Sequence, residues 1–122
     1  MPENEPKASP DSGPNAGSLT PADLGRFGQK HVGSWLHVSG YVVKQVNELP
    51  GLTEIEADHP TSKMLVHVRT SLMPAAPKDL SPEEFNNLKS RALEAGRKPY
   101  AAKVRVDHKG RLIGGVKWQN VG

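Results

Sequence analysis

The sequence contains no cysteine, and among its 122 residues there are only two each of Trp, Tyr and Phe. Without cysteine, neither a disulfide framework nor a thiolate metal site is possible. An apolar run of 18 residues is also absent, and the first ten residues, MPENEPKASP, lack a basic start followed by an apolar core. We therefore expect no membrane span and no secretory signal, and an intracellular location that is cytoplasmic, nucleoid or nuclear.

Apolar side chains are scarcest at the N-terminus. Residues 1–19 consist largely of Pro, Gly, Ser, Asn and Glu. Such a segment buries too little apolar surface to offset the entropy lost on ordering. The composition therefore predicts a disordered tail over residues 1–19 and a single folded domain over residues 20–122.

Acidic residues are scarce at the other end of the chain. The whole sequence has a formal charge of +3, but residues 85–122 hold nine Lys and Arg against only Glu94 and Asp107. A basic segment of this kind favours a polyanionic partner such as nucleic acid. The alternative interpretation is a charged surface that only keeps the domain in solution.

Two helix starts are visible. Thr20 can cap a helix, Pro21 suits the first helical position and Asp23 favours the positive helix end. The stretch Ser81-Pro82-Glu83-Glu84 has the same features, and apolar residues three or four apart follow it as far as Gly96. We expect a short helix from residue 20 and a longer one over residues 81–95.

Alternating polar and apolar side chains predict five strands, at residues 34–46, 52–57, 63–71, 100–107 and 111–118. Five strands with a helix between the third and the fourth is the order of an OB-fold, a mainly β, five-stranded Greek-key barrel. Gly40 would let the long first strand bend between the two layers of the barrel. The alternative architecture is an open α+β sheet of unrelated topology.

A resemblance supports the barrel. The stretch LGRFGQKHVGSWLHVSGYVVKQV at residues 24–46 resembles the start of OB-fold proteins of the replication protein A small-subunit type and of their telomere-capping relatives, and LTEIEADHPTSKMLVHV continues the pattern. The similarity covers about residues 21–70. It implies a short helix, then a first strand with a central glycine, and a nucleic-acid-binding barrel.

Motifs of enzymes are missing. The five histidines (31, 37, 59, 67 and 108) form no pair at i, i+4, and there is neither a Gly-x-Ser-x-Gly elbow nor a P-loop. The pair Gly114-Gly115 lacks the further glycines and the following helix of a phosphate-binding loop. We therefore predict no catalytic residues, no metal site and no cofactor, and hence no enzyme.

The function predicted from these patterns is non-catalytic binding of single-stranded nucleic acid, by aromatic stacking beside a basic groove. The residues expected to make the contacts are Trp35, Tyr41, Arg69, Lys103, Arg105, Lys109, Arg111 and Lys117. Glu54 and Glu56 count against this surface, unless they pair with basic neighbours. The alternative is a protein-interaction or assembly module that uses the barrel edge or the helix at 81–95.

Overall fold

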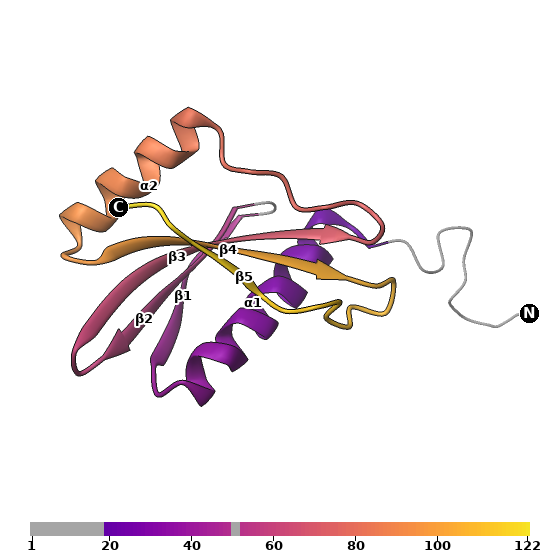
Figure 1. The fold of residues 1–122 in the computed structure, drawn as a ribbon, viewed down its shortest axis with the longest axis horizontal. Helices are drawn as coiled ribbons and strands as arrows, with labels where there is room; N and C mark the ends of the chain where they lie inside the picture. Colours follow the sequence, from indigo (N-terminus) through magenta and orange to yellow (C-terminus); the bar gives the residue numbers. More distant parts are fainter. Residues whose placement is uncertain (1–18, 50–51) are drawn as a thin grey trace, which may run out of the picture.

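A computed structural model describes residues 19–49 and 52–122 (Figure 1). The predicted tail over residues 1–19 lies almost entirely outside this part of the chain, so that prediction is left untested. The elements in chain order are α1 (Pro21–Val38), β1 (Val42–Leu49), β2 (Leu52–His59), β3 (Ser62–Leu72), α2 (Pro82–Glu94), β4 (Lys98–Val106) and β5 (Lys117–Asn120).

Helix α1 begins where the sequence predicts but is much longer. Thr20 forms a capping box with Asp23, and Pro21 takes the first helical position. Beyond Gly33 the helix continues through residues 34–38, which we predicted to be strand, so that prediction is wrong. Val32 and Leu36, four residues apart, are both fully buried, as the helical period requires, whereas Val38, which strand alternation would place on the same face as Leu36, is 85 % exposed.

Gly40 ends this helix and does not bend a strand. Its φ of +95° lies in the left-handed region, which glycine adopts without steric cost. Its backbone N–H donates to His37 O, and the N–H of Tyr41 donates to Leu36 O. These two bonds form a Schellman motif, in which the last carbonyl groups of the helix find partners.

The sheet is open and mixed, so the OB-fold barrel is wrong. Its strands follow the order β1-β2-β3-β4-β5, with β1 and β5 at the two edges. The pairing of β3 with β4 is parallel, and the other three pairings are antiparallel. Because residues 34–38 are helical, the first strand is too short to belong to two layers, and the sheet does not close.

The last strand is also shorter than predicted. Only Lys117 and Trp118 of the predicted segment 111–118 lie in β5. Residues 107–116 form an irregular connection, in which Leu112 makes a single bridge to Val106. Glycine at 114, with φ of +73°, turns the chain there and interrupts the ladder.

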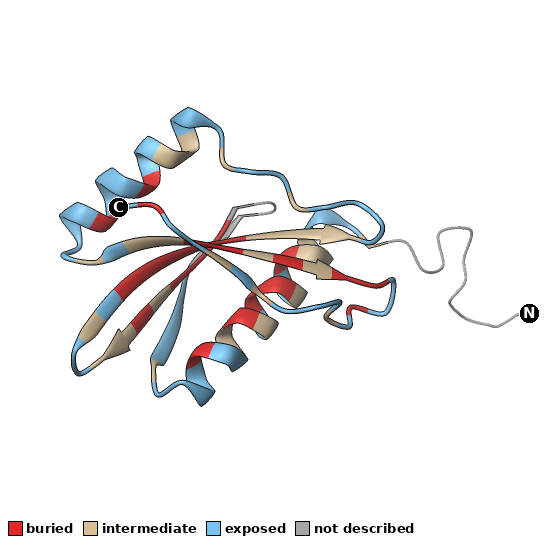
Figure 2. Ribbon diagram, viewed as in Figure 1, coloured by how far each residue is buried: buried red, intermediate tan, exposed pale blue. Residues whose placement is uncertain are grey.

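The two helices cover opposite faces of the sheet (Figure 1). Helix α1 packs on the larger core, whose buried members include Leu36, Val66 and Val104. On the other face α2 seals a smaller core, in which Leu88 contacts the strand residues Leu65 and Ala101. Figure 2 shows the buried residues concentrated along the central strands and on the side of α1 that faces them.

Candidate functional site

The face of the sheet beneath α2 is polar along the centre of the sheet. Side chains alternate between faces along a strand, so neighbours of the buried Ile55, Val66 and Val68 point to the α2 side. The polar residues placed there are Glu54 and Glu56 of β2, His67 and Arg69 of β3, and Lys103 and Arg105 of β4. The sequence predicted this alternation correctly.

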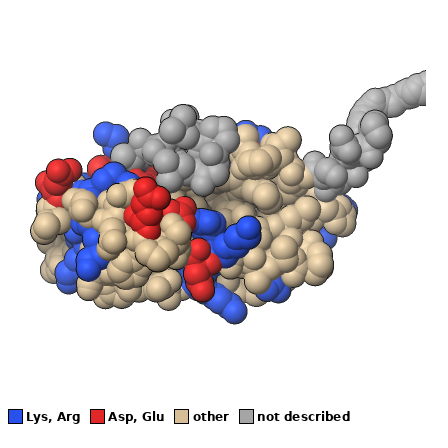
Figure 3. Space-filling view, turned by 90° about the horizontal axis from the view of Figure 1, so that it is seen from above, with Lys and Arg blue, Asp and Glu red and all other residues tan. Residues whose placement is uncertain are grey.

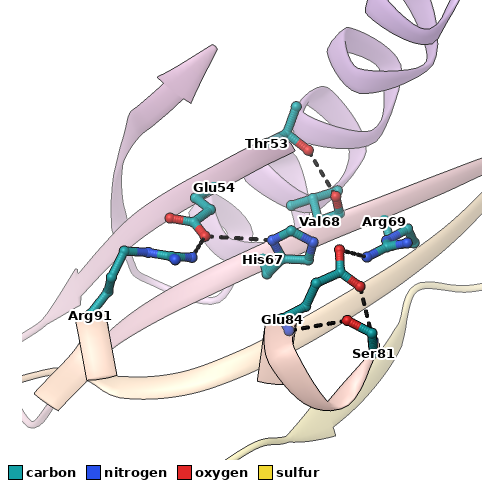
Figure 4. Close-up of polar contacts among 8 residues, drawn as sticks. All are labelled: Thr53, Glu54, His67, Val68, Arg69, Ser81, Glu84 and Arg91. Carbon is teal, nitrogen blue, oxygen red and sulfur yellow. Dashed lines mark hydrogen bonds and ion pairs between the residues drawn. The ribbon is translucent and has the colours of Figure 1, made fainter. Parts of the chain in front are cut away.

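A buried ion-pair cluster lies at the middle of this face. Glu54 and His67 are register partners on β2 and β3, and each residue is only 2 % exposed. Glu54 Oε2 lies 3.5 Å from His67 Nδ1 and accepts a hydrogen bond from Arg91 of α2 (Figure 4). The carboxylate is therefore held between two elements that are distant in sequence.

Two opposing effects act on the Glu54 carboxyl. Burial disfavours its ionised form, but the hydrogen bond from His67 and the positive charge of Arg91 outweigh burial. As a result the pKa of Glu54 is lowered from its ordinary value. Glu54 is thus an ionised, hydrogen-bonded carboxylate beside an imidazole.

The other ring nitrogen of His67 is free. Nε2 is buried and has no hydrogen-bond partner among the described residues. An unpartnered polar atom in a protein interior is costly and calls for an explanation, such as a catalytic role or a bound ligand. When a carboxylate lies beside Nδ1 and Nε2 has no partner, an imidazole can accept a proton at Nε2.

A second ion pair lies two residues along β3 from His67, on the same face of the sheet. Arg69 Nη2 lies 2.5 Å from Glu84 Oε2 (Figure 4). The capping box of α2 positions this carboxylate: the Ser81 N–H donates to Glu84 Oε1, and the Glu84 N–H donates to Ser81 Oγ. The bond from the Ser81 N–H is the main cause of the lowered pKa of Glu84, against burial and with help from Arg69.

Basic side chains form a row across three strands next to this cluster. In the ladder, Arg69 of β3 lies opposite Lys103 of β4, and Lys103 lies opposite Lys117 of β5. We call Arg69, Lys103 and Lys117 the cationic row. Like charges directly opposite one another destabilise a sheet, so packing alone does not explain the row. Figure 3 shows blue and red side chains gathered together near the middle of the face seen from above.

The eight predicted nucleic-acid contacts are divided among three places. Arg69, Lys103, Arg105 and Lys117 lie together on the α2 side. The aromatic candidates lie on the α1 side: Trp35 packs against Trp118, and Tyr41 packs against His59. The remaining two, Lys109 and Arg111, lie in the turn after β4, where their backbone N–H groups donate to Asp107 Oδ1.

Sequence reasoning missed the central residues. The strand pattern placed Glu54 and His67 on one face but gave no reason to pair them, because the predicted barrel did not specify the register. Arg91 lies in the helix at 81–95, for which the sequence suggested only a role in protein interaction. As the sequence allowed, the glutamates do pair with basic residues: Glu54 with Arg91, and Glu56 with Arg97. One feature of the sequence could have indicated the cluster: each of two adjacent strands has a polar residue in a segment whose other residues are predicted to be buried.

The polar side chains of this face are also potential ligands for a divalent metal ion, so the donor set must be tested for one. Glu54 and His67 are two potential ligands, and Glu54 Oε2 is already occupied by Arg91. Within residues 19–49 and 52–122 no group of three or more His, Asp or Glu side chains lies close enough to hold an ion. A resident metal held by three protein ligands does not fit the residues described.

Comparisons with known proteins identify the fold. No protein-family model matches the chain, and no curated protein matches it in sequence. Among solved structures the chain is similar to Hjc, a Holliday junction resolvase from the archaeal hyperthermophile Archaeoglobus fulgidus. The sequences are 18 % identical, the TM-score is 0.56, and the match covers 80 % of this chain and 72 % of the resolvase.

This likeness corrects several predictions. The resemblance to replication protein A and the OB-fold are wrong, because the matched fold is an open mixed sheet with a helix on each face. A non-catalytic module, whether for single-stranded nucleic acid or for a protein partner, was predicted from the barrel. That prediction, together with the absence of enzymatic activity, is overturned by a neighbour that is a resolvase. Separately, neither described helix is long and apolar enough to cross a membrane.

Proposed function

We propose that this protein is a nuclease that binds DNA along the cationic row and cleaves a phosphodiester bond at the Glu54–His67 pair. The observation that carries the proposal is the buried pair with a free imidazole nitrogen, adjacent to Arg69, on a fold similar to that of a Holliday junction resolvase. The residues present are those that phosphoryl chemistry requires: a positioned base and cations.

The chemistry follows from the two nitrogen atoms of His67. Glu54 accepts a hydrogen bond from Nδ1 and orients the ring, which leaves Nε2 to take a proton from water. The water oxygen then forms a bond to phosphorus, and the bond from phosphorus to one ester oxygen breaks. The imidazolium returns the proton to the departing oxygen, so charge and atoms balance.

Two arginines are placed to bind the phosphate group. Arg69 and Arg91 flank the imidazole, and a guanidinium matches the geometry of phosphate oxygens and stabilises charge that develops on them. The side chain of Arg91 is 43 % exposed, whereas that of Glu54 is 3 % exposed. Displacement of the Arg91 side chain is therefore the least costly way to open the pair to a substrate.

A direct assay tests this function. The full chain is incubated with a labelled four-way junction, with a duplex of the same arms and with each single strand, in the presence of Mg²⁺, of Mn²⁺ or of a chelator. We expect cleavage of at least one of these DNAs. The comparison also decides whether the DNA must be single-stranded, as the sequence predicts, or double-stranded. Absence of cleavage of all of them by folded protein would refute the proposal.

Three variants assign the activity to the site. Glu54→Gln and His67→Gln remove the charge and the base, and each should lower the cleavage rate by about 100-fold or more. Glu56→Gln is the matched control, since Glu56 lies two residues along the same face of β2 and pairs with Arg97 instead. Circular dichroism at the assay temperature confirms that each variant is folded. Full activity in both site variants would place the chemistry elsewhere.

A further inference from the structure

A basic pocket lies at the end of the cationic row and shares Lys103 and Lys117 with it, but the cleavage step proposed at His67 does not use the pocket. Its volume is about 330 Å³. Its lining includes Ala76 and Pro77, from the segment that leads towards α2, and the glycine pair Gly114-Gly115. The charged residues that line it are Lys103, Arg105 and Lys117.

The charge of this pocket is poorly balanced. Lys103 pairs with Asp79, whose side chain is 85 % exposed and therefore easily displaced into water. Neither Arg105 nor Lys117 forms an ion pair with any acidic side chain of the described residues. Since Lys103 and Lys117 lie directly opposite one another, an anion bound between them would relieve their repulsion.

The glycine pair leaves the backbone open to such an anion. A Cβ atom placed on Gly114 or Gly115 would meet no atom within 4 Å, so the space in front of them is free. The N–H of the preceding Ile113 donates to Arg105 O, but no hydrogen bond from either glycine N–H occurs among the described residues. The sequence alone does not predict a phosphate loop here, because the basic side chains come from β4 and β5.

We propose that this pocket binds a phosphate monoester at the end of a DNA strand, which names the substrate of the nuclease proposed above as DNA with a phosphorylated end. A monoester carries a charge of about −1.5 to −2 at neutral pH, whereas a diester inside the chain carries a single charge. Three cations and two free N–H groups match the more highly charged group. The cationic row then leads the strand from its end towards His67.

A binding experiment tests the inference without any need for cleavage. Oligonucleotides with a 5′-phosphate, a 3′-phosphate or only hydroxyl ends are titrated with the full chain in a chelating buffer, and fluorescence anisotropy reports the affinity. We expect one phosphorylated form to bind about tenfold more tightly, which corresponds to about 1.4 kcal/mol. The two phosphorylated oligonucleotides distinguish which end is recognised. Equal affinity for all three oligonucleotides would overturn the inference.

Two variants and the pH dependence test whether this pocket causes the preference for a phosphorylated end. Arg105→Gln should remove the preference for the phosphorylated end, whereas Lys98→Gln, at the exposed start of the same strand, should retain it. The preference should grow between about pH 5 and 7, because the second ionisation of the phosphate lies near pH 6. A preference that survives Arg105→Gln would overturn the assignment to this pocket. Loss of cleavage with a retained end preference would refute only the nuclease.

Discussion

The two faces of the sheet are built on different principles. Beneath α1 lies a continuous apolar core in which Val32, Leu36 and Val66 are fully buried. Beneath α2 the apolar cluster is smaller, and charged side chains share the face with it. An apolar face is stabilised by burial alone, while a charged face needs a partner for every group. The α1 face therefore holds the fold, and the α2 face is available for chemistry.

The largest effect that we expect is on the α1 face. Leu36→Ala should lower the free energy of unfolding by about 3–5 kcal/mol, and Leu88→Ala on the α2 face by about 2–3 kcal/mol. The reason is that Leu36 belongs to the larger cluster, which relaxes less around a cavity. Urea unfolding followed by circular dichroism measures both. Equal losses of unfolding free energy in the two variants would show that the two faces contribute equally to stability.

The next effect concerns the buried pair. Glu54→Gln should destabilise the protein by about 1–3 kcal/mol, since it removes the negative charge that Arg91 and His67 share and replaces one carboxylate oxygen with an amide donor. In a double-mutant cycle with Arg91→Met, the coupling energy should be about 0.5–3 kcal/mol. Additive losses would show that the α2 face is not held by this ion pair.

Lowering the pH should destabilise the α2 face of the sheet before the α1 face. The folded pKa values of Glu54, Glu84 and Asp58 are lowered, so their contribution to stability is present above the unfolded values, about 4.5 for glutamate, and is lost as the pH falls through the folded values. On the α1 side the only comparable carboxylate of the helix is Asp23, whose pKa is lowered by the Thr20 hydrogen bonds but which lies in the exposed first turn and not in the core. On acidification to pH 3.5, protection against hydrogen exchange should therefore be lost in α2 before α1. Simultaneous exchange of both helices would contradict this.

A related acid effect concerns the turn after β4. Backbone N–H groups, first that of Arg111, lower the pKa of Asp107 to about 2. Its stabilising contribution should be complete above its ordinary value of 3.8 and decline as the pH falls towards 2. Asp107→Asn should flatten the stability profile in this window, as measured by thermal unfolding. An unchanged profile would mean that the turn does not depend on this charge.

The smallest effect tests the cationic row. Lys117→Gln removes one of two opposed lysines, and we expect stability to rise by about 0.2–0.5 kcal/mol. The same change should reduce the salt dependence of DNA binding by about one unit of log–log slope or less. Lys98→Gln is the control in both measurements. A loss of stability in Lys117→Gln would show that the row has a structural purpose.

Local features were predictable from the sequence. Both capping boxes, the helix after Ser81 and the alternation of Glu54, Arg69 and Lys103 onto one face follow from short-range chemistry. The errors arose where two local patterns compete. Residues 34–38 alternate in polarity, yet they also continue the helical spacing of Val32 and Leu36, and the larger core favours the helix.

The sequence by itself determined where the helices begin, which faces of the strands carry polar side chains and that basic residues gather in the last third of the chain. These properties depend on each residue and on its neighbours in sequence, within about one helical turn. Only the tertiary structure decided that β3 and β4 pair in parallel, that the sheet remains open and that His67 lies against Glu54. Such pairings join distant segments, and their free energy depends on the packing of the whole sheet rather than on any local pattern.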